Sequence, residues 1–319
     1  MKSLARLPRI PLTALVAALI VTSASAATDG WTEDFPEAKA QVKASGQDLL
    51  MYFTGSDWCP PCIALNDEVL STEAFLDAAP RDFVLVKLDF PNTIPQTETL
   101  VNQNQALAAK YDVGTFPTIL LADASGTPYA KTGYRPGGAE PYLAHLDELR
   151  ANRVARDEAM AIAKEADGLD KARAFDDAMD AVGLDLAVAH YPSVVAYIMA
   201  LDPDNAAGLK GKYDAAMLEV KIDADVQEAI EILQAGEIEA GLARLDQVIE
   251  DHSLEGEFLQ MVIAIKGQVH LQLGEKDQAI SLLEQAVAVD PKSEIAGQIN
   301  AMIEHVKSMP ANTQIAPSQ

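Results

Sequence analysis

The sequence has few of the residues that carry metal, nucleic-acid or membrane chemistry. It contains two cysteines and five histidines, and its 24 basic residues face 48 acidic ones, which gives a net charge of −24. A surface this acidic repels phosphate backbones, so nucleic acid is excluded as the expected partner. No two histidines have the spacing of a helical metal site, and we expect neither a metal nor another cofactor. After Gly30, no apolar run is long enough to span a bilayer.

The proportions of apolar and charged residues are typical of globular proteins. Apolar residues make up 49% and charged residues 23% of the 319 positions. This composition argues against wholesale disorder, and the length favours two domains.

The N-terminal segment over 1–26 has the three parts of a secretory signal. A positive start with Lys2, Arg6 and Arg9 precedes an apolar run over 12–21, and Ala24-Ser25-Ala26 supplies the small-residue cleavage pattern. The run is too short for a membrane helix, although an uncleaved anchor is the alternative. We therefore expect a signal peptide over 1–26, no membrane span after its cleavage, and export to the periplasm of a Gram-negative cell.

Both cysteines lie in one motif at a predicted strand-to-helix junction. Residues 48–54 predict a buried strand, and the apolar spacing after Cys62 predicts a helix that begins with Pro60 and Pro61. Unpaired N–H groups at a helix N-terminus favour a thiolate at Cys59. Cys62 is about one turn away and can form a disulfide with Cys59. Half of a zinc site and a static structural disulfide are the alternatives, but no second cysteine or histidine pair completes a zinc site.

Two segments of the chain together resemble the signatures of the thioredoxin family. The first is Trp58-Cys59-Pro60-Pro61-Cys62, and the second, further along the chain, is Gly114-Thr115-Phe116-Pro117-Thr118. The resemblance implies that Pro117 is a cis-proline facing the disulfide, and that Phe116 pairs its backbone with a substrate chain. Trp58 would contribute to substrate binding or to the structure of the site. The segments at 55–58 and 133–138 resemble a secreted bacterial branch of this superfamily.

The order of predicted elements agrees with the resemblance over residues 31–150. Strands are predicted at 83–90, 119–121 and 128–133, a helix at 96–111, a turn at Ser125-Gly126, and a closing helix that opens at 142–149. The family implies an α/β thioredoxin-like fold, a central mixed sheet flanked by helices, for a domain spanning 27–150.

One position departs from the family. Small thioredoxins carry a buried aspartate on the strand before the motif, where this chain has Tyr52 or Phe53. Lys87 resembles the family lysine beside that acid. We expect it to lack an acid partner and to stabilise a thiolate if it points toward the sulfurs, the alternative being a surface lysine. Asp57 is a second candidate for tuning the thiol pKa or accepting a proton, the alternative being a solvated carboxylate.

The mechanism that the resemblance implies is thiol–disulfide exchange. Cys59 attacks a partner disulfide and Cys62 resolves the mixed disulfide. Partners would be protein disulfides or dithiols and an unidentified redox protein, and the direction of exchange is not readable. The alternative is an interaction or scaffold protein with this fold and no significant turnover.

Residues 151–308 predict an all-α region. They are alanine-rich and acidic, and helical periodicity dominates. One segment has the spacing of a tetratricopeptide repeat, at Ile263, Gly267, His270, Ala279, Leu283, Ala286 and Pro291. A weaker copy lies upstream, around Gly236, Leu245 and Val248. We expect either a surface that binds a protein or peptide, or a helical cap without a ligand. Residues 309–319 predict a disordered tail.

Overall fold

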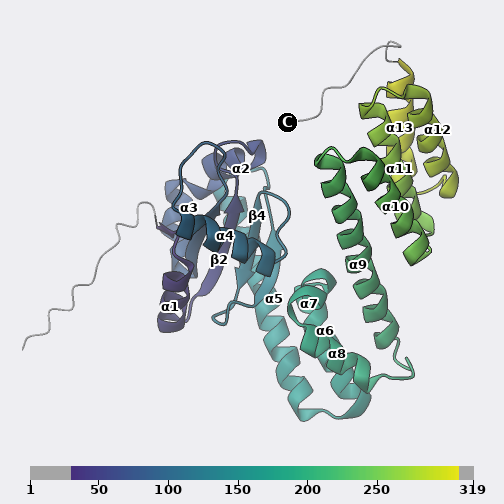
Figure 1. The fold of residues 1–319 in the computed structure, drawn as a ribbon. Helices are drawn as coiled ribbons and strands as arrows, with labels where there is room; N and C mark the ends of the chain where they lie inside the picture. The colour runs from purple at the N-terminus through teal and green to yellow at the C-terminus, as the bar shows by residue number, and fades with distance from the viewer. Residues whose placement is uncertain (1–29, 309–319) are drawn as a thin grey trace, which may run out of the picture. The chain divides into compact units, whose positions relative to one another are not determined.

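The computed structural model describes residues 30–308. The predicted signal peptide over 1–26 and the predicted tail over 309–319 lie outside the described residues. The chain divides into two compact units between Ala151 and Asn152. Figure 1 shows the elements of both units.

The first unit contains one five-stranded mixed sheet. Its elements are β1 (Trp31–Thr32), α1 (Phe35–Ser45), β2 (Asp48–Thr54), α2 (Pro60–Leu65), the π-helical turn η1 (Asn66–Leu70), α3 (Glu73–Ala78), the 3₁₀ turn η2 (Ala79–Arg81), β3 (Phe83–Asp89), α4 (Glu98–Lys110), β4 (Thr118–Ala122) and β5 (Pro128–Thr132). The strand order is β1-β3-β2-β4-β5. β3 runs parallel to β1 and β2, whereas β4 runs antiparallel to β2 and β5.

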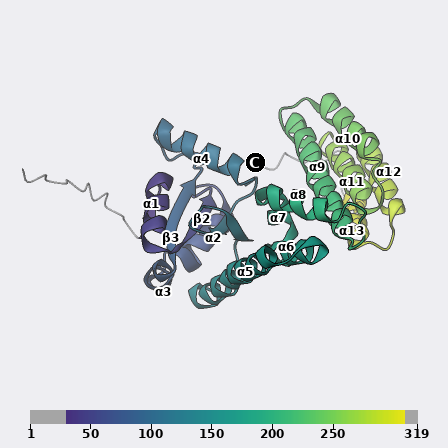
Figure 2. The ribbon, with the colours of Figure 1, turned by 90° about the horizontal axis from the view of Figure 1, so that it is seen from below.

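The central strand β2 is buried along its whole length, as its unbroken apolar run predicts for a strand covered on both faces. Figure 2 shows α4 on one side of the sheet and the start of α5 (Ala139–Glu165) on the other. The predicted thioredoxin-like fold is therefore confirmed. The closing helix is longer than expected, because α5 continues through the change of composition at Arg150.

The second unit is helical, as expected. It continues with α6 (Gly168–Val182), α7 (Leu184–His190), α8 (Pro192–Leu201), α9 (Leu209–Gln234), α10 (Ile238–His252), α11 (Gly256–Gln272), α12 (Lys276–Val289) and α13 (Glu294–Ser308). Neighbouring helices α9 and α10 pack together, and so do α11 and α12. The first pair has an apolar core around Leu245 and Val248, and a second core around Leu283 and Ala286 joins α12 to Ile299 and Ile303 of α13.

Among residues 30–308, no single helix has the length and apolar character to cross a membrane. Helices α7 and α8 reach that threshold only as a pair, and they are bent by 103° at the break between them.

Candidate active site

The two cysteines lie where the central strand passes into a helix. Cys59 is the N-cap of α2 with extended backbone angles, and Pro60 and Pro61 fill the first two helical positions, as predicted. Cys59 and Cys62 form a disulfide with their Cα atoms 5.2 Å apart. Cys62 is fully buried and Cys59 is 4% exposed. The structure therefore brings together a nearly buried, closed pair at the end of β2.

The two prolines change how α2 can act on Cys59. Proline has no N–H group, so the first two positions of the helix offer no donor to a thiolate. The next two N–H groups, of Cys62 and Ile63, both donate to the carbonyl oxygen of Cys59 at 3.0 Å. Direct hydrogen-bond stabilisation of a Cys59 thiolate by this helix end is therefore weaker than the position alone suggests.

Of the two residues expected in place of the family's acid, Tyr52 is the one that contacts the cysteine pair. Its hydroxyl donates to the carbonyl oxygen of Cys62 at 3.0 Å and accepts from Thr54 Oγ1 at 2.8 Å. Burial raises the pKa of Tyr52 to about 12. The other possible residue, Phe53, packs its ring against Tyr111 instead. A neutral phenol therefore contacts the backbone of Cys62.

The loop before β4 lies against the tryptophan of the motif. The Phe116–Pro117 peptide bond is cis, as the resemblance implied. The ring of Phe116 stacks on Phe90 at 4.9 Å between centroids and meets Trp58 edge-on at 6.0 Å. Trp58 Nε1 donates to the carbonyl oxygen of Phe90 at 2.8 Å, and the side chain stays 44% exposed. Trp58, Phe90 and Phe116 thus form an aromatic rim, partly open to solvent, beside Cys59.

Two glycines make room for this rim. A Cβ atom on Gly55 would lie 2.4 Å from Cε2 of Trp58, and one on Gly133 would lie 2.9 Å from the carbonyl oxygen of Pro117. Real Cβ atoms do not approach other atoms this closely, so a side chain at either position would displace the rim. The hydroxyl of Tyr142 donates to the carbonyl oxygen of Gly133 and so helps to hold Gly133 close to Pro117.

Asp57 binds a neighbouring loop. Its carboxylate accepts hydrogen bonds from Thr93 Oγ1 at 2.5 Å, and from the backbone N–H groups of Asn92 and Thr93 at 2.9 and 2.6 Å. The bond from the Thr93 hydroxyl, followed by the backbone bonds, lowers the pKa of Asp57 to about 2. A carboxylate with that pKa is a poor proton acceptor. The geometry therefore favours a structural role for Asp57, in which it connects the motif to the loop after β3, over a role as a base.

Lys87 has an acid partner, contrary to the expectation from the sequence. Its Nζ lies 3.1 Å from Oδ2 of Asp89, two residues along the same strand. The carboxylate of Asp89 also accepts from the N–H of Ser56 at 3.0 Å and from its hydroxyl at 2.6 Å. The expectation failed because it considered only the strand before the motif, whereas the acid lies on β3. The sequence signal for this partner was the aspartate that ends the apolar run of β3.

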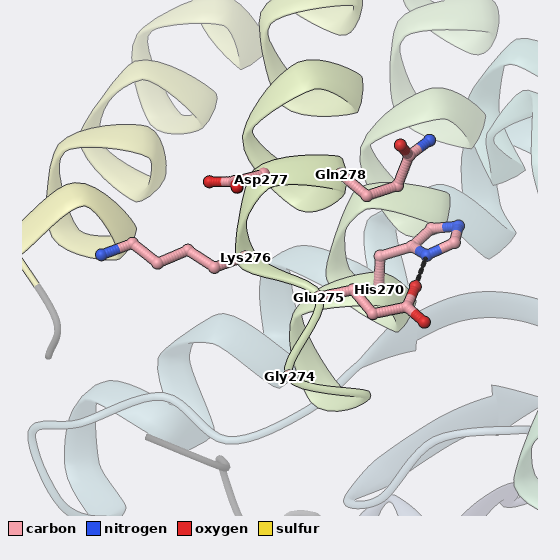
Figure 3. Close-up of a pocket in the computed structure, with 6 residues that line it drawn as sticks. All are labelled: His270, Gly274, Glu275, Lys276, Asp277 and Gln278. Atoms are coloured by element: carbon pink, nitrogen blue, oxygen red, sulfur yellow. Dashed lines mark hydrogen bonds and ion pairs between the residues drawn. The ribbon is translucent and has the colours of Figure 1, made fainter. Parts of the chain in front are cut away.

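A pocket in the helical unit lies at the turn between α11 and α12. His270, Gly274, Glu275, Lys276, Asp277 and Gln278 line it. Figure 3 shows His270 and Glu275 turned toward one another, with Nδ1 and Oε2 2.5 Å apart. These two groups are engaged with each other, and within residues 30–308 no cluster of three or more His, Cys, Asp or Glu could hold a metal ion. The cysteine pair therefore remains the candidate active site.

Comparison with known proteins supports this location. Residues 35–149 match the family described as a thioredoxin-like domain, so the helical unit lies outside the matched segment. The chain is 36% identical over 114 residues to the disulfide bond reductase DsbH of Chlamydia pneumoniae, a match that covers 36% of this chain and 69% of the relative. It is 34% identical over 91 residues to the thioredoxin-related protein DsbJ of the same organism, covering 28% of this chain and 26% of that relative.

Two solved structures are also similar. A DsbH oxidoreductase is 34% identical and matches 37% of this chain and 81% of its own, with a TM-score of 0.36. A thioredoxin from Thermus thermophilus is 29% identical and matches 38% of this chain and 84% of its own, with a TM-score of 0.27.

Proposed function

This chain belongs to the thioredoxin-like family, and from that membership we propose that it is an exported thiol–disulfide oxidoreductase that reduces disulfides in protein substrates. The observation that carries the proposal is the Cys59–Cys62 disulfide at the start of α2, beside the cis Phe116–Pro117 loop. The reductive direction rests on the name of the relative, disulfide bond reductase.

The proposed reaction moves two electrons from the cysteine pair to the substrate. The Cys59 thiolate attacks one sulfur of a substrate disulfide, and the other substrate sulfur leaves as a thiolate that takes up a proton. Cys62 then loses its proton and attacks Cys59 Sγ, which releases the second substrate thiol and closes the Cys59–Cys62 disulfide. A separate dithiol donor reduces the pair for the next cycle.

Trp58, Phe116 and Pro117 have the proposed role of holding the substrate chain. Phe116 would pair its backbone with an extended segment, an interaction that does not depend on the substrate's sequence. The partly exposed aromatic rim would cover that segment while its disulfide meets Cys59. Export to the periplasm, predicted from residues 1–26, would place the enzyme among proteins that carry disulfides.

The proposed role of the helical unit is to bind the protein substrate. The supporting observation is a run of large apolar residues that is exposed on α9, formed by Met217, Leu218 and Val220. Exposed apolar clusters of this kind mark protein-binding surfaces. If the unit recruits the substrate, replacing Leu218 by Ser slows reduction of the natural protein substrate but not of a small disulfide. Equal rates for both would leave the unit as a helical cap.

Reduction of insulin disulfides tests the proposed function directly. The purified chain, supplied with a dithiol, should precipitate the insulin B chain faster than the dithiol alone. The Cys59→Ser variant should give only the background rate, because it has no nucleophile. A wild-type protein no faster than the background would favour the alternative, a thioredoxin-like scaffold without significant turnover.

A further inference from the structure

A partly buried ion pair lies on the strand next to the cysteine pair. Nζ of Lys87 is 3.1 Å from Oδ2 of Asp89, and the Asp89 side chain is only 7% exposed. In the parallel pairing of β2 and β3, Lys87 stands opposite Tyr52 and Asp89 opposite Thr54. Neighbouring strands are about 4.8 Å apart, so both charges lie one strand away from the residues beneath Cys62.

Asp89 can act on the cysteines in two ways. The first is electrostatic and passes through Tyr52, whose hydroxyl accepts from Thr54 Oγ1 and donates to the carbonyl oxygen of Cys62. After burial, the charge of Asp89 also contributes to the raised pKa of Tyr52, so that carboxylate acts on the hydroxyl electrostatically. The second runs through Ser56, which donates twice to Asp89 and lies shortly before Cys59 in the chain.

The local helix end makes these charges more important. Since Pro60 and Pro61 offer no N–H group, a thiolate in this motif receives little direct hydrogen bonding from α2. Nearby charge is then the main remaining influence on the thiolate fraction. A lysine beside the site would favour the thiolate, and an aspartate would disfavour it. With both present and paired, their effects largely cancel.

We propose that Asp89 is a positioning residue that neutralises Lys87, and that the balance between these two charges sets the thiolate fraction of the Cys59–Cys62 pair. This inference rests on the proposed function, because it concerns the reactivity of the same cysteines. It assigns the acid partner of Lys87 to β3.

Other charged groups near the motif stay constant in the test. They are Asp57, which is bonded to the loop after β3, Asp67, whose charge also raises the pKa of Tyr52, and Glu68, which accepts from the hydroxyl of Tyr134. None of them contacts Lys87 or Asp89 in the hydrogen bonds and ion pairs described for residues 30–308. A change at Lys87 or Asp89 therefore alters the local charge without altering theirs.

The test measures the pH profile of iodoacetamide labelling in the reduced full chain. Asp89→Asn, which keeps the shape of the side chain, leaves Lys87 uncompensated and should move the midpoint of the profile to lower pH by about one unit. Lys87→Met leaves Asp89 uncompensated and should move the midpoint to higher pH by about one unit. One unit is the low end of the shift that a close charge produces. The double variant should label within about twofold of the wild type.

A matched control separates charge from shape. Lys87→Arg keeps the charge and should therefore keep the wild-type pH profile. If Asp89→Asn does not fold, a comparison of Lys87→Met with Lys87→Arg still shows in which direction loss of the positive charge shifts the labelling profile. Shifts in the same direction for Asp89→Asn and Lys87→Met, or wild-type profiles for both, would overturn the inference.

The proposed function can fail separately from this inference. If the wild type reduces no insulin, the oxidoreductase proposal fails even where the labelling profiles shift in opposite directions. If the wild type reduces insulin and the two variants do not shift oppositely, only the role of Asp89 fails.

Discussion

Glycines lie at close contacts in both units of the chain, but what they hold in place differs. In the thioredoxin-like unit, Gly55 leaves space for the Trp58 ring, and Gly133 leaves space for the carbonyl oxygen of Pro117. In the helical unit, a Cβ atom on Gly241 would lie 2.5 Å from Cγ of Leu233, a side chain of the neighbouring helix. Glycine therefore makes room for the aromatic rim beside Cys59 in one unit and for close helix packing in the other.

The two helical pairs carry their close-contact glycines on different helices. A Cβ atom on Gly267 of α11 would lie 3.0 Å from Cγ of Leu283 and 3.3 Å from the carbonyl oxygen of Ala279, both on α12. In the weaker upstream copy of the repeat, Ala229 stands at the position of Gly267, and Gly241 stands at the position of Ala279. The glycine therefore sits on the first helix in one pair and on the second helix in the other. In both pairs a glycine faces a backbone carbonyl oxygen of the other helix. The pairs differ in which of the two helices carries the glycine.

Replacing Gly133 by Ala should have the largest effect on activity. The added methyl group would meet a backbone atom that cannot rotate away, so the loop carrying Phe116 must move. A misplacement of about 1 Å can cost about 100-fold in rate, and we expect turnover of insulin to fall between about 10- and 100-fold.

Gly114→Ala is the matched control, because Gly114 lies in the loop that carries Phe116. Nothing lies within 4 Å of its Cβ position, so it should reduce insulin at the wild-type rate. A Gly133→Ala enzyme as fast as Gly114→Ala would show that the position of this loop does not limit exchange.

Replacing Gly241 by Ala should have the opposite signature, with a loss of stability and unchanged chemistry. Overpacking a close helix contact costs about 1–3 kcal/mol. Gly267→Ala should cost less, because its contacts are longer. Thermal unfolding followed by circular dichroism measures both, and reduction of hydroxyethyl disulfide should proceed at the wild-type rate.

Gly297→Ala on α13 is the control for the helical unit. No atom lies within 4 Å of its Cβ position. Alanine is a better helix former than glycine by up to about 1 kcal/mol, so this variant should be as stable as the wild type or more stable. If all three glycine variants lose stability equally, close packing is not the reason for the glycines.

The smallest expected effect is a pH dependence of stability through Asp57. Its folded pKa of about 2 lies below the ordinary value of 3.8. A depressed pKa contributes stability that is complete above the ordinary value and is lost as the pH falls through the folded value. The stability difference between wild type and Asp57→Asn should therefore shrink as the pH falls from the ordinary value toward the folded one. A difference that stays constant over that range would contradict the bonded role of this carboxylate.

Much of the fold and of the site follows from local sequence signals. The apolar run of β2, the prolines that open α2 and the turn at Gly126 are all read from neighbouring residues. The acid partner of Lys87 could not be read in this way, since it required knowing which strand supplies the carboxylate. The hydrogen bonds that Asn92 and Thr93 donate to Asp57 join loops that are far apart in the sequence. The contact at Gly241 could not be predicted from the stronger repeat, because the weaker repeat carries its glycine on the second helix of the pair and not on the first.

Trapping the mixed disulfide tests exchange through Cys59 most directly. A Cys62→Ser variant lacks the resolving thiol, so a protein substrate attacked by Cys59 should stay attached. We expect a covalent complex that a reductant dissociates and that peptide mapping locates at Cys59. We also expect no such complex in a variant with both Cys59→Ser and Cys62→Ser. Incubation of Cys62→Ser with oxidised insulin that yields no covalent complex would contradict exchange through Cys59.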